Sequence, residues 1–172
     1  MAMSLGTPIS IEEYLRTSYS PDREYRDGQV MERNVGDNAH SLLQAALGAY
    51  LANRRKRWQI QPYISLRIRA RADWYPIPDV CVYPLPAPEE RFPSTMPLLW
   101  VEILSDDDRM IEVWEKAADL VACGAPNVWI INPHTLESQL LTPSGGPNQV
   151  PGKTLQIPGT PIVIPLIDVM EE

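Results

Sequence analysis

The sequence predicts a single α/β domain in which helices flank a mixed β-sheet. Three observations support this prediction. Residues 38–57 carry a helical apolar stripe, strand-like segments follow, and then a second helical segment precedes another apolar strand. The length of 172 residues is typical of one domain. With 44% hydrophobic and 22% charged residues, the composition is that of a globular protein rather than a disordered or fibrous one.

Two local signals come before this core. Ser10 to Glu13 have the S-x-x-E form of a capping box, which predicts a short helix through about Arg16. Further on, Asp27-Gly28 lies between two short extended segments over residues 24–32. An Asp-Gly pair in that position is typical of a tight turn, so these residues predict a β-hairpin.

The spacing of apolar residues predicts the central elements. In residues 38–57 they recur every three or four positions, which indicates a long helix that ends in a basic turn. Residues 59–70 alternate between apolar and polar or basic side chains, which predicts a strand with a basic face. Residues 80–83 predict a second, short strand. Residues 98–104 are apolar except for Glu102, the pattern of a strand buried on both faces.

The second half continues the pattern with a helix, a strand and edge strands. Ser105 and the three aspartates that follow it are suited to the start of a helix, which runs to Cys123 before Gly124 and Pro126. Residues 128–131 predict a strand that lies parallel to 98–104, because a helix connects the two. Segments 136–141 and 162–166 predict edge strands. The proline-rich segments 76–97 and 143–165 predict rigid loops.

The charge is unevenly distributed along the chain. A formal net charge of −7 argues against a protein that coats nucleic acid without specificity. Residues 54–71 nevertheless hold seven of the fifteen basic residues and no acidic one, whereas residues 102–119 hold seven acidic residues. The N-terminal ten residues lack the basic and apolar parts of an export signal. We therefore expect a soluble cytoplasmic protein in which Cys81 and Cys123 are reduced core thiols.

Two carboxylates lie where they need an explanation. Glu102 interrupts a buried strand, and a buried carboxylate is costly unless it is paired or binds a metal. One possibility is an ion pair with Arg67 or Arg69 of the preceding strand. Asp79 follows a proline and can simply form a turn. However, both acids belong to predicted strands of one sheet, so together they can also bind a hard cation.

An ordered series of motifs resembles the Uma-type putative restriction endonuclease family, a branch of the PD-(D/E)XK nuclease superfamily. The similarity spans about residues 8–168, which we expect to form one nuclease-like domain. It implies a restriction-endonuclease-like α-β-β-β-α-β core with an N-terminal hairpin and C-terminal edge strands. The motifs that carry it are Glu24-Tyr25-Arg26-Asp27-Gly28, the helix entry from Gly36 to His40, Pro78-Asp79-Val80, Val101-Glu102-Ile103-Leu104-Ser105, Glu115-Lys116 and Gly124 to Pro133.

The resemblance implies a Mg²⁺-dependent endonuclease for which Mn²⁺ can substitute. In such a site Asp79, Glu102 and the Ile103 carbonyl hold the metal. The superfamily places a lysine two residues after the glutamate, but this chain has Leu104 there. The branch takes its lysine from the following helix, which corresponds to Lys116. Val113 and Leu120 share the helix face of Lys116, which points inward. The alternative for Lys116 is a solvated residue paired with Glu112 or Asp119.

Further residues are candidates with open alternatives. Glu24 is either an additional metal or water-orienting acid or the partner of an arginine within the hairpin. His40 is either catalytic or a residue that helps to begin its helix, and His134 is expected to be exposed in a turn. The expected partners are DNA, as the substrate, and a second copy of the chain in a homodimer. The alternative is an inactive nuclease-like domain that binds nucleic acid or a protein partner. A basic rim for nucleic acid is predicted from Arg54, Arg55, Arg57, Arg67 and Arg69, which can equally be a solvated helix end with cross-strand pairs.

Overall fold

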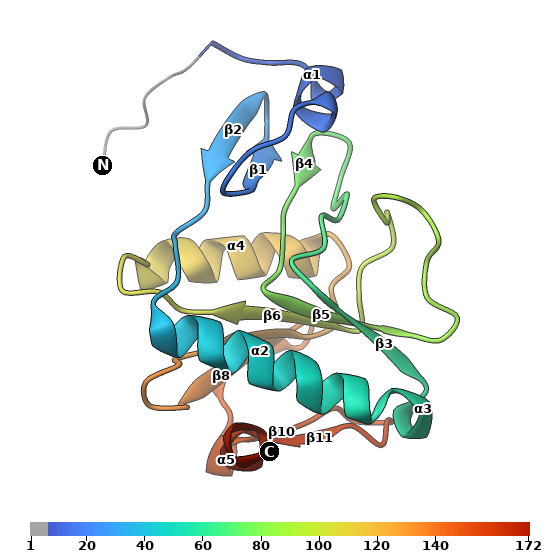
Figure 1. Ribbon diagram of the computed structural model, residues 1–172, viewed down its shortest axis with the longest axis vertical. Coiled ribbons are helices and arrows are strands. Elements are labelled where there is room, and N and C mark those ends of the chain that lie inside the picture. The colour runs from blue at the N-terminus through green and yellow to red at the C-terminus, as the bar shows by residue number, and fades with distance from the viewer. Residues whose placement is uncertain (1–6) are drawn as a thin grey trace.

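The computed structural model describes residues 7–172 and contains a six-stranded mixed sheet at its centre (Figure 1). The strand order is β3-β5-β6-β7-β8-β9. Strands β6 and β7 are parallel, and the other neighbours in this sheet are antiparallel. The strand bounds are β3 Ile60–Ile64, β5 Val80–Pro84, β6 Leu99–Ile103, β7 Val128–Ile131, β8 Ser138–Thr142 and β9 Gly145–Gln149.

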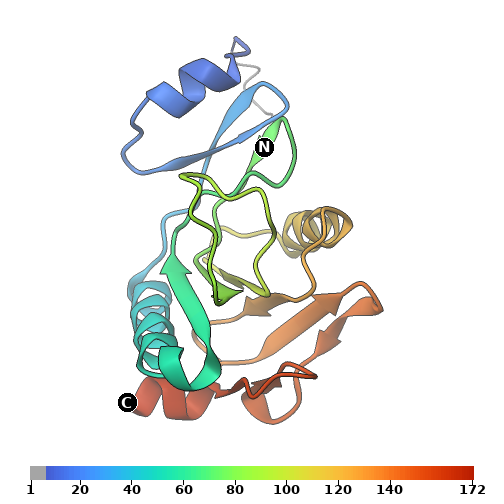
Figure 2. The ribbon, with the colours of Figure 1, turned by 90° about the vertical axis from the view of Figure 1, so that its right-hand side faces the viewer.

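Two helices cover opposite faces of this sheet. Helix α2 (Asn38–Asn53) lies on one face and helix α4 (Met110–Ala122) on the other (Figures 1 and 2). Because side chains alternate along a strand, β6 contributes to both layers. Its residues Leu99, Val101 and Ile103 belong to the apolar cluster under α2, whereas Trp100 belongs to the cluster under α4. The strand is therefore buried on both faces, as its apolar run predicts.

The chain order of the core agrees with the predicted α-β-β-β-α-β series. Helix α2 is followed by β3, β5 and β6, then by α4 and β7. Strand β7 pairs in parallel with β6, with Glu102 opposite Ile130. The parallel connection predicted between residues 98–104 and 128–131 is thus confirmed. This arrangement matters for the site because it places α4 directly after the strand that carries Glu102.

A smaller unit stands beside the central sheet, at the top of Figure 1. It contains helix α1 (Ile11–Arg16) and a three-stranded sheet of order β2-β1-β4. Strands β1 (Arg23–Arg26) and β2 (Gln29–Glu32) form the predicted hairpin, with Asp27-Gly28 as its turn. Strand β4 (Trp74–Tyr75) pairs with β1. Tyr14, Tyr25 and Tyr75 form the buried centre of this unit.

The C-terminal region contains more regular structure than its prolines predict. Segment 143–165, expected to be a rigid loop, holds the edge strand β9 and a separate two-stranded sheet. Strand β8 is therefore not at the edge of the central sheet, since β9 pairs with it on the outside. The remaining bounds are η1 Pro151–Lys153, β10 Thr154–Gln156, β11 Val163–Pro165 and α5 Leu166–Glu171.

Three predicted boundaries are wrong. The strand predicted over residues 59–70 ends at Ile64, because Ser65 takes a left-handed conformation with φ of 51° and its N–H donates to the Asp79 carbonyl. The helix predicted over 38–57 ends at Asn53, and a short helix α3 (Arg55–Trp58) follows. Helix α4 begins at Met110 rather than near residue 106, because the Asp108 carboxylate accepts from the Ser105 N–H and holds a turn there.

The prediction that both cysteines are reduced core thiols is confirmed only in part. Both thiols are free; Cys81 is fully buried, whereas Cys123 is half-buried and only partly in the core. Within residues 7–172, no helix is both long and apolar enough to cross a membrane. The prediction about an export signal concerns residues that include 1–6, which lie outside the described residues.

Helix α2 begins at a side-chain cap that we expect to be important for stability. Asp37 Oδ1 accepts a hydrogen bond of 2.9 Å from the His40 N–H, which is otherwise unpaired at the first turn. We expect Asp37→Ala to lower the free energy of unfolding, because the His40 N–H loses its acceptor; urea denaturation measures this loss. Asp106→Ala is the matched control, since Asp106 also contacts His134 but caps no helix. Equal losses in both variants would contradict the capping role.

Candidate active site

A cavity of about 380 Å³ lies between the small sheet, strand β6 and helix α4. It brings together residues that are up to 92 positions apart in the sequence. All six residues predicted for the catalytic or metal site line it, namely Glu24, His40, Asp79, Glu102, Ile103 and Lys116. This cavity is therefore the candidate active site of the protein.

Asp79 lies immediately before β5, where the pairing of β5 with β6 ends. The backbone N–H of Asp79 donates to the Val101 carbonyl of β6, and its carboxylate accepts from a residue further along the same strand. There Asp79 Oδ2 accepts a hydrogen bond of 2.7 Å from the Ile103 N–H. The side chain is only 8% exposed. The end of the β5–β6 ladder therefore holds this carboxylate in a fixed position at the cavity.

Glu102 points toward α4, on the side of β6 that also carries Trp100. Its Oε1 atom accepts a hydrogen bond of 2.8 Å from the Trp100 indole and lies 2.9 Å from Lys116 Nζ. Burial raises the pKa of Glu102; Lys116 opposes this effect, and the neighbouring carboxylates of Asp79 and Glu24 add to it. The ion pair predicted as an alternative, with Arg67 or Arg69, is not formed, because the partner comes from α4 instead.

Lys116 projects from α4 toward the sheet. Its Nζ atom lies 2.9 Å from both Glu24 Oε1 and Glu102 Oε1. The predicted alternative partners Glu112 and Asp119 pair elsewhere, with Arg109 and Arg26 respectively. Burial lowers the pKa of Lys116, but the two carboxylates outweigh burial and raise it above its usual range. Lys116 is therefore a fixed cation at neutral pH.

Glu24 reaches the cavity from β1. Its side chain is 9% exposed, and Oε1 accepts a hydrogen bond of 3.0 Å from the Ile77 N–H as well as the contact from Lys116. The predicted alternative, a pair with an arginine of the hairpin, is not what the structure shows. In the hairpin it is Arg23 that pairs across the strands, with Glu32. Glu24 thus fixes the position of Lys116 from the side opposite to the central sheet.

His40 lies in the first turn of α2 and faces Asp79. His40 Nε2 is 3.3 Å from Asp79 Oδ2, and hydrogen bonding to that carboxylate raises the pKa of His40 against the opposing effect of burial. One turn further along α2, Gln44 Nε2 donates to the Asp79 carbonyl at 2.9 Å. Helix α2 therefore supports both the backbone and the side chain of Asp79.

Arg33 lies at the centre of the site, although no sequence motif predicts a role for it. Its guanidinium Nη2 is 3.1 Å from Asp79 Oδ1, in a pair whose side chains are 23% and 8% exposed. Arg33 follows the hairpin as an isolated basic residue, and its partner lies 46 residues away. Nothing in the local pattern marks it, since only the docking of the hairpin on the central sheet brings the two side chains together.

The donor atoms at the cavity fit a hard divalent cation such as Mg²⁺. In the described part of the chain, the contacts of Glu102 fall on Oε1, which leaves Oε2 for a cation. The Ile103 carbonyl points to the same side of β6 as the Ile103 N–H, which donates to Asp79. Proteins usually hold Mg²⁺ through one or two carboxylates, with water completing the coordination. Asp79, Glu102 and the Ile103 carbonyl are therefore sufficient ligands.

The five arginines predicted as a nucleic-acid rim do not line this cavity. Arg54 pairs with Glu172 and stacks on Tyr50, while Arg67 pairs with Asp22. Arg55, Arg57 and Arg69 are exposed. Helix α2 has 16 residues and is therefore about 24 Å long, so the arginines after its C-terminal end are far from His40 at its N-terminal end (Figure 1).

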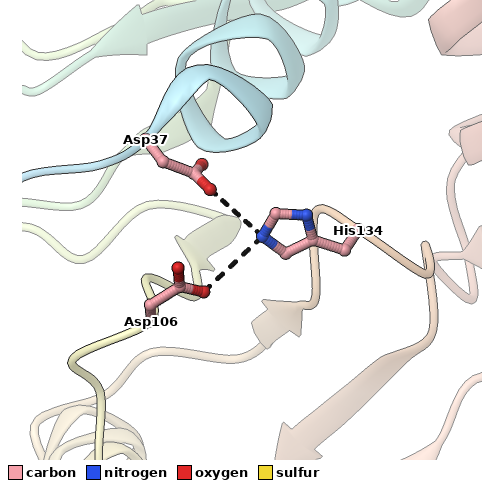
Figure 3. Close-up of side chains that lie close together, drawn as sticks. All are labelled: Asp37, Asp106 and His134. Atoms are coloured by element: carbon pink, nitrogen blue, oxygen red, sulfur yellow. Dashed lines mark ion pairs between the residues drawn. The ribbon is translucent and has the colours of Figure 1, made fainter.

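His134 is exposed, as predicted, and belongs to a surface cluster outside the cavity. Figure 3 shows its ring between two carboxylates, with Nε2 3.2 Å from Asp37 Oδ2 and 3.6 Å from Asp106 Oδ1. Sequence analysis does not predict this group, because the three residues come from separate segments. The cluster connects the start of α2 with the loops after β6 and β7. We assign it no part in the chemistry of the cavity.

The comparisons with known proteins match the fold to that of a putative nuclease. The chain belongs to the Uma2 family, described as putative restriction endonuclease, whose model matches residues 11–164. A crystal structure of a putative nuclease belonging to DUF820 from Anabaena variabilis ATCC 29413 has a similar fold, with a TM-score of 0.80 and 20% identity. The match covers 95% of this chain and 98% of that chain. No curated protein matches the sequence.

Proposed function

We propose that the protein is a Mg²⁺-dependent endonuclease that hydrolyses phosphodiester bonds in DNA. The observation that carries the proposal is the convergence of Asp79, Glu102 and Lys116 on one cavity. These residues come from the start of β5, from β6 and from α4. Two carboxylates that fit a divalent cation, together with a fixed ammonium group, are suited to metal-dependent hydrolysis of a phosphodiester, because both stabilise the negative charge that develops on the phosphate. Membership of the Uma2 family supports the same class of activity.

The protonation state of Lys116 defines its role in this mechanism. Because Glu24 and Glu102 raise its pKa, the amine stays protonated and is not a general base. We expect the ammonium group to stabilise the negative charge that develops on the phosphate and to orient the attacking water. Leu104, at the position where the superfamily has its lysine, then needs no charge. Glu24 keeps Lys116 aligned when Glu102 is also engaged with a cation.

The two carboxylates provide the cation site. Asp79 is oriented by the Ile103 N–H and by His40, and Glu102 by Trp100 and Lys116. Asp79 and Glu102 would hold Mg²⁺ there, and the ion would supply an activated water and positive charge for the reacting phosphate. Mn²⁺ has a similar preference for carboxylate, carbonyl and water ligands, so we expect it to substitute.

The alternative function is binding of nucleic acid or a protein partner without cleavage. A specific observation favours it, because Arg33 already neutralises Asp79 at 3.1 Å. In this alternative the cavity is a set of internal ion pairs that stabilise the fold. The two functions differ in a measurable way, since only the nuclease requires a divalent cation.

We expect the protein to nick and linearise supercoiled plasmid in Mg²⁺ or Mn²⁺ and to lose this activity in EDTA. Asp79→Asn is expected to abolish cleavage, because it removes a charged cation ligand. Asp168→Asn is the matched control, since Asp168 is an exposed aspartate of α5, away from the cavity. Gel analysis of plasmid, single-stranded DNA and RNA checks both the activity and the substrate. Binding of DNA with no cleavage in either metal would favour the alternative.

A further inference from the structure

The position of Arg33 conflicts with the binding of a cation to Asp79. Its guanidinium contacts Asp79 Oδ1 at 3.1 Å and the Ile77 carbonyl at 3.3 Å. The opposite oxygen, Oδ2, already faces the Ile103 N–H and His40. Since each carboxylate oxygen has about two acceptor sites, Oδ1 is the oxygen with room for a metal. A divalent cation on Asp79 therefore has to share that atom with Arg33 or displace it.

The other lysines and arginines of the cavity do not compete with a cation for Asp79. Lys116 keeps Glu24 as a partner when Glu102 binds a cation. Arg26 pairs with Asp119 and stacks on Trp74. Arg109 pairs with Glu112 and has a side chain that is 65% exposed, with no contact to Asp79. Among the lysines and arginines that line the cavity within the described residues, Arg33 alone has a predicted metal ligand as its single carboxylate partner. His40 also contacts Asp79, but at the opposite oxygen, Oδ2.

The charge of the cavity wall indicates why an arginine that is free to leave Asp79 would help to bind nucleic acid. Besides the three site carboxylates, the cavity wall carries Glu32, Asp108, Glu112 and Glu115. A polyanion that enters this acidic cavity needs a cation to bind, and guanidinium groups match the geometry of phosphate oxygens well. Arg33 already lines the cavity and is 23% exposed.

We propose that Arg33 is a phosphate-binding residue that is held on Asp79 until a divalent cation displaces it, whereupon it binds the phosphodiester. This inference rests on the proposed function, because it requires the cation site at Asp79. It assigns Arg33 two effects of opposite sign. Arg33 weakens the binding of the cation, and it strengthens the binding of the nucleic acid. A purely structural ion pair can also weaken the binding of the cation, but it does not strengthen the binding of the nucleic acid.

The first test measures Mn²⁺ binding to the protein by isothermal titration calorimetry. Arg33→Gln is expected to bind Mn²⁺ about tenfold more tightly than wild type, because it removes a competing positive charge from Asp79; tenfold is within the usual range of coupling between two sites. Arg109→Gln is the matched control: it removes the same charge from the same cavity, yet Arg109 has no contact with Asp79. We expect its affinity to stay within about twofold of wild type.

The second test measures binding of a fluorescent DNA duplex in Ca²⁺, with gels to verify that the duplex stays intact. Arg33→Gln is expected to weaken the affinity about tenfold. It is also expected to flatten the slope of log affinity against log salt by about 0.9, the value for one phosphate contact. An unchanged slope and affinity would overturn the assignment of Arg33 to phosphate.

A third measurement uses the wild-type protein and does not depend on the folding of Arg33→Gln. The Arg33 Nε–H signal in ¹H–¹⁵N spectra, identified by its loss in Arg33→Lys, is expected to shift on addition of Mg²⁺. The Arg71 signal is the control, because Arg71 pairs with Asp27 and Asp73 outside the cavity. A stationary Arg33 signal at Mg²⁺ saturation would show that Arg33 stays on Asp79.

The outcomes separate this inference from the proposed function. If wild type binds Mn²⁺ and Asp79→Asn does not, the cation site is supported. In that case, equal Mn²⁺ affinities of wild type and Arg33→Gln would overturn the inference about Arg33 and leave the proposed cation site intact. If neither wild type nor Arg33→Gln binds Mn²⁺, the cation site fails, and the inference fails with it.

Discussion

Replacing Lys116 with methionine is expected to lower the rate of DNA cleavage by about 10²–10³, the usual cost of losing a preorganised electrostatic contact to the reacting group. Methionine has a similar length but no charge, so the cavity keeps its shape. The variant loses the ammonium group that Glu24 and Glu102 hold at 2.9 Å. Single-turnover cleavage at saturating Mg²⁺ measures the effect. Lys56→Met on α3 is the control, because Lys56 is exposed and does not line the cavity.

The same substitution is expected to destabilise the fold. Lys116→Met leaves the buried carboxylate of Glu24 and the partly buried carboxylate of Glu102 without their cation. Removing one partner of a buried ion pair typically costs about 3–5 kcal/mol. The double variant Glu24→Gln/Lys116→Met removes one of those charges and is expected to recover part of the loss, as measured by urea denaturation. Full cleavage activity in a folded Lys116→Met protein would return Lys116 to a purely structural role. Addition of Leu104→Lys tests whether an amine at that position reaches the same phosphate.

The second prediction concerns Glu102→Gln, which is expected to abolish cleavage while leaving the metal-free protein as stable as wild type or slightly more stable. Glutamine retains an oxygen to accept from the Trp100 indole, and Lys116 retains Glu24. The substitution also removes the repulsion that Asp79 and Glu24 exert on Glu102, which helps to raise its pKa after the larger effect of burial. Thermal unfolding in EDTA checks this stability.

The gain in stability on addition of metal is expected to differ between wild type and Glu102→Gln. A cation at 100 times its Kd stabilises the wild-type protein by about 2.7 kcal/mol, and Glu102→Gln is expected to lose most of this gain in Mg²⁺ or Mn²⁺. Glu115→Gln is the matched control, since Glu115 is an exposed cavity residue of α4 that makes no contact with Lys116. A large loss of stability in metal-free Glu102→Gln would identify the Glu102–Lys116 pair as structural.

The order of the core elements and most of the site are evident from local patterns. The apolar spacing of residues 38–57, the buried run at 98–104 and the helix before residues 128–131 correspond to α2, β6, α4 and β7. Glu102 stands out because a carboxylate in a buried strand needs a partner. Lys116 stands out because its helix face also carries apolar residues. These features depend on neighbours within a few positions, which a sequence records directly.

The partners of these residues depend on contacts between distant segments. Lys116 has acidic neighbours on its own helix, yet the packing of α4 against β6 and β1 pairs it with Glu102 and Glu24. Arg33 reaches Asp79 only because the hairpin docks beside the central sheet. The strand pattern of residues 59–70 breaks at Ser65, where a left-handed turn directs the chain away from the sheet. Periodicity describes one segment at a time, whereas these ion pairs and turns are selected by how the segments pack together.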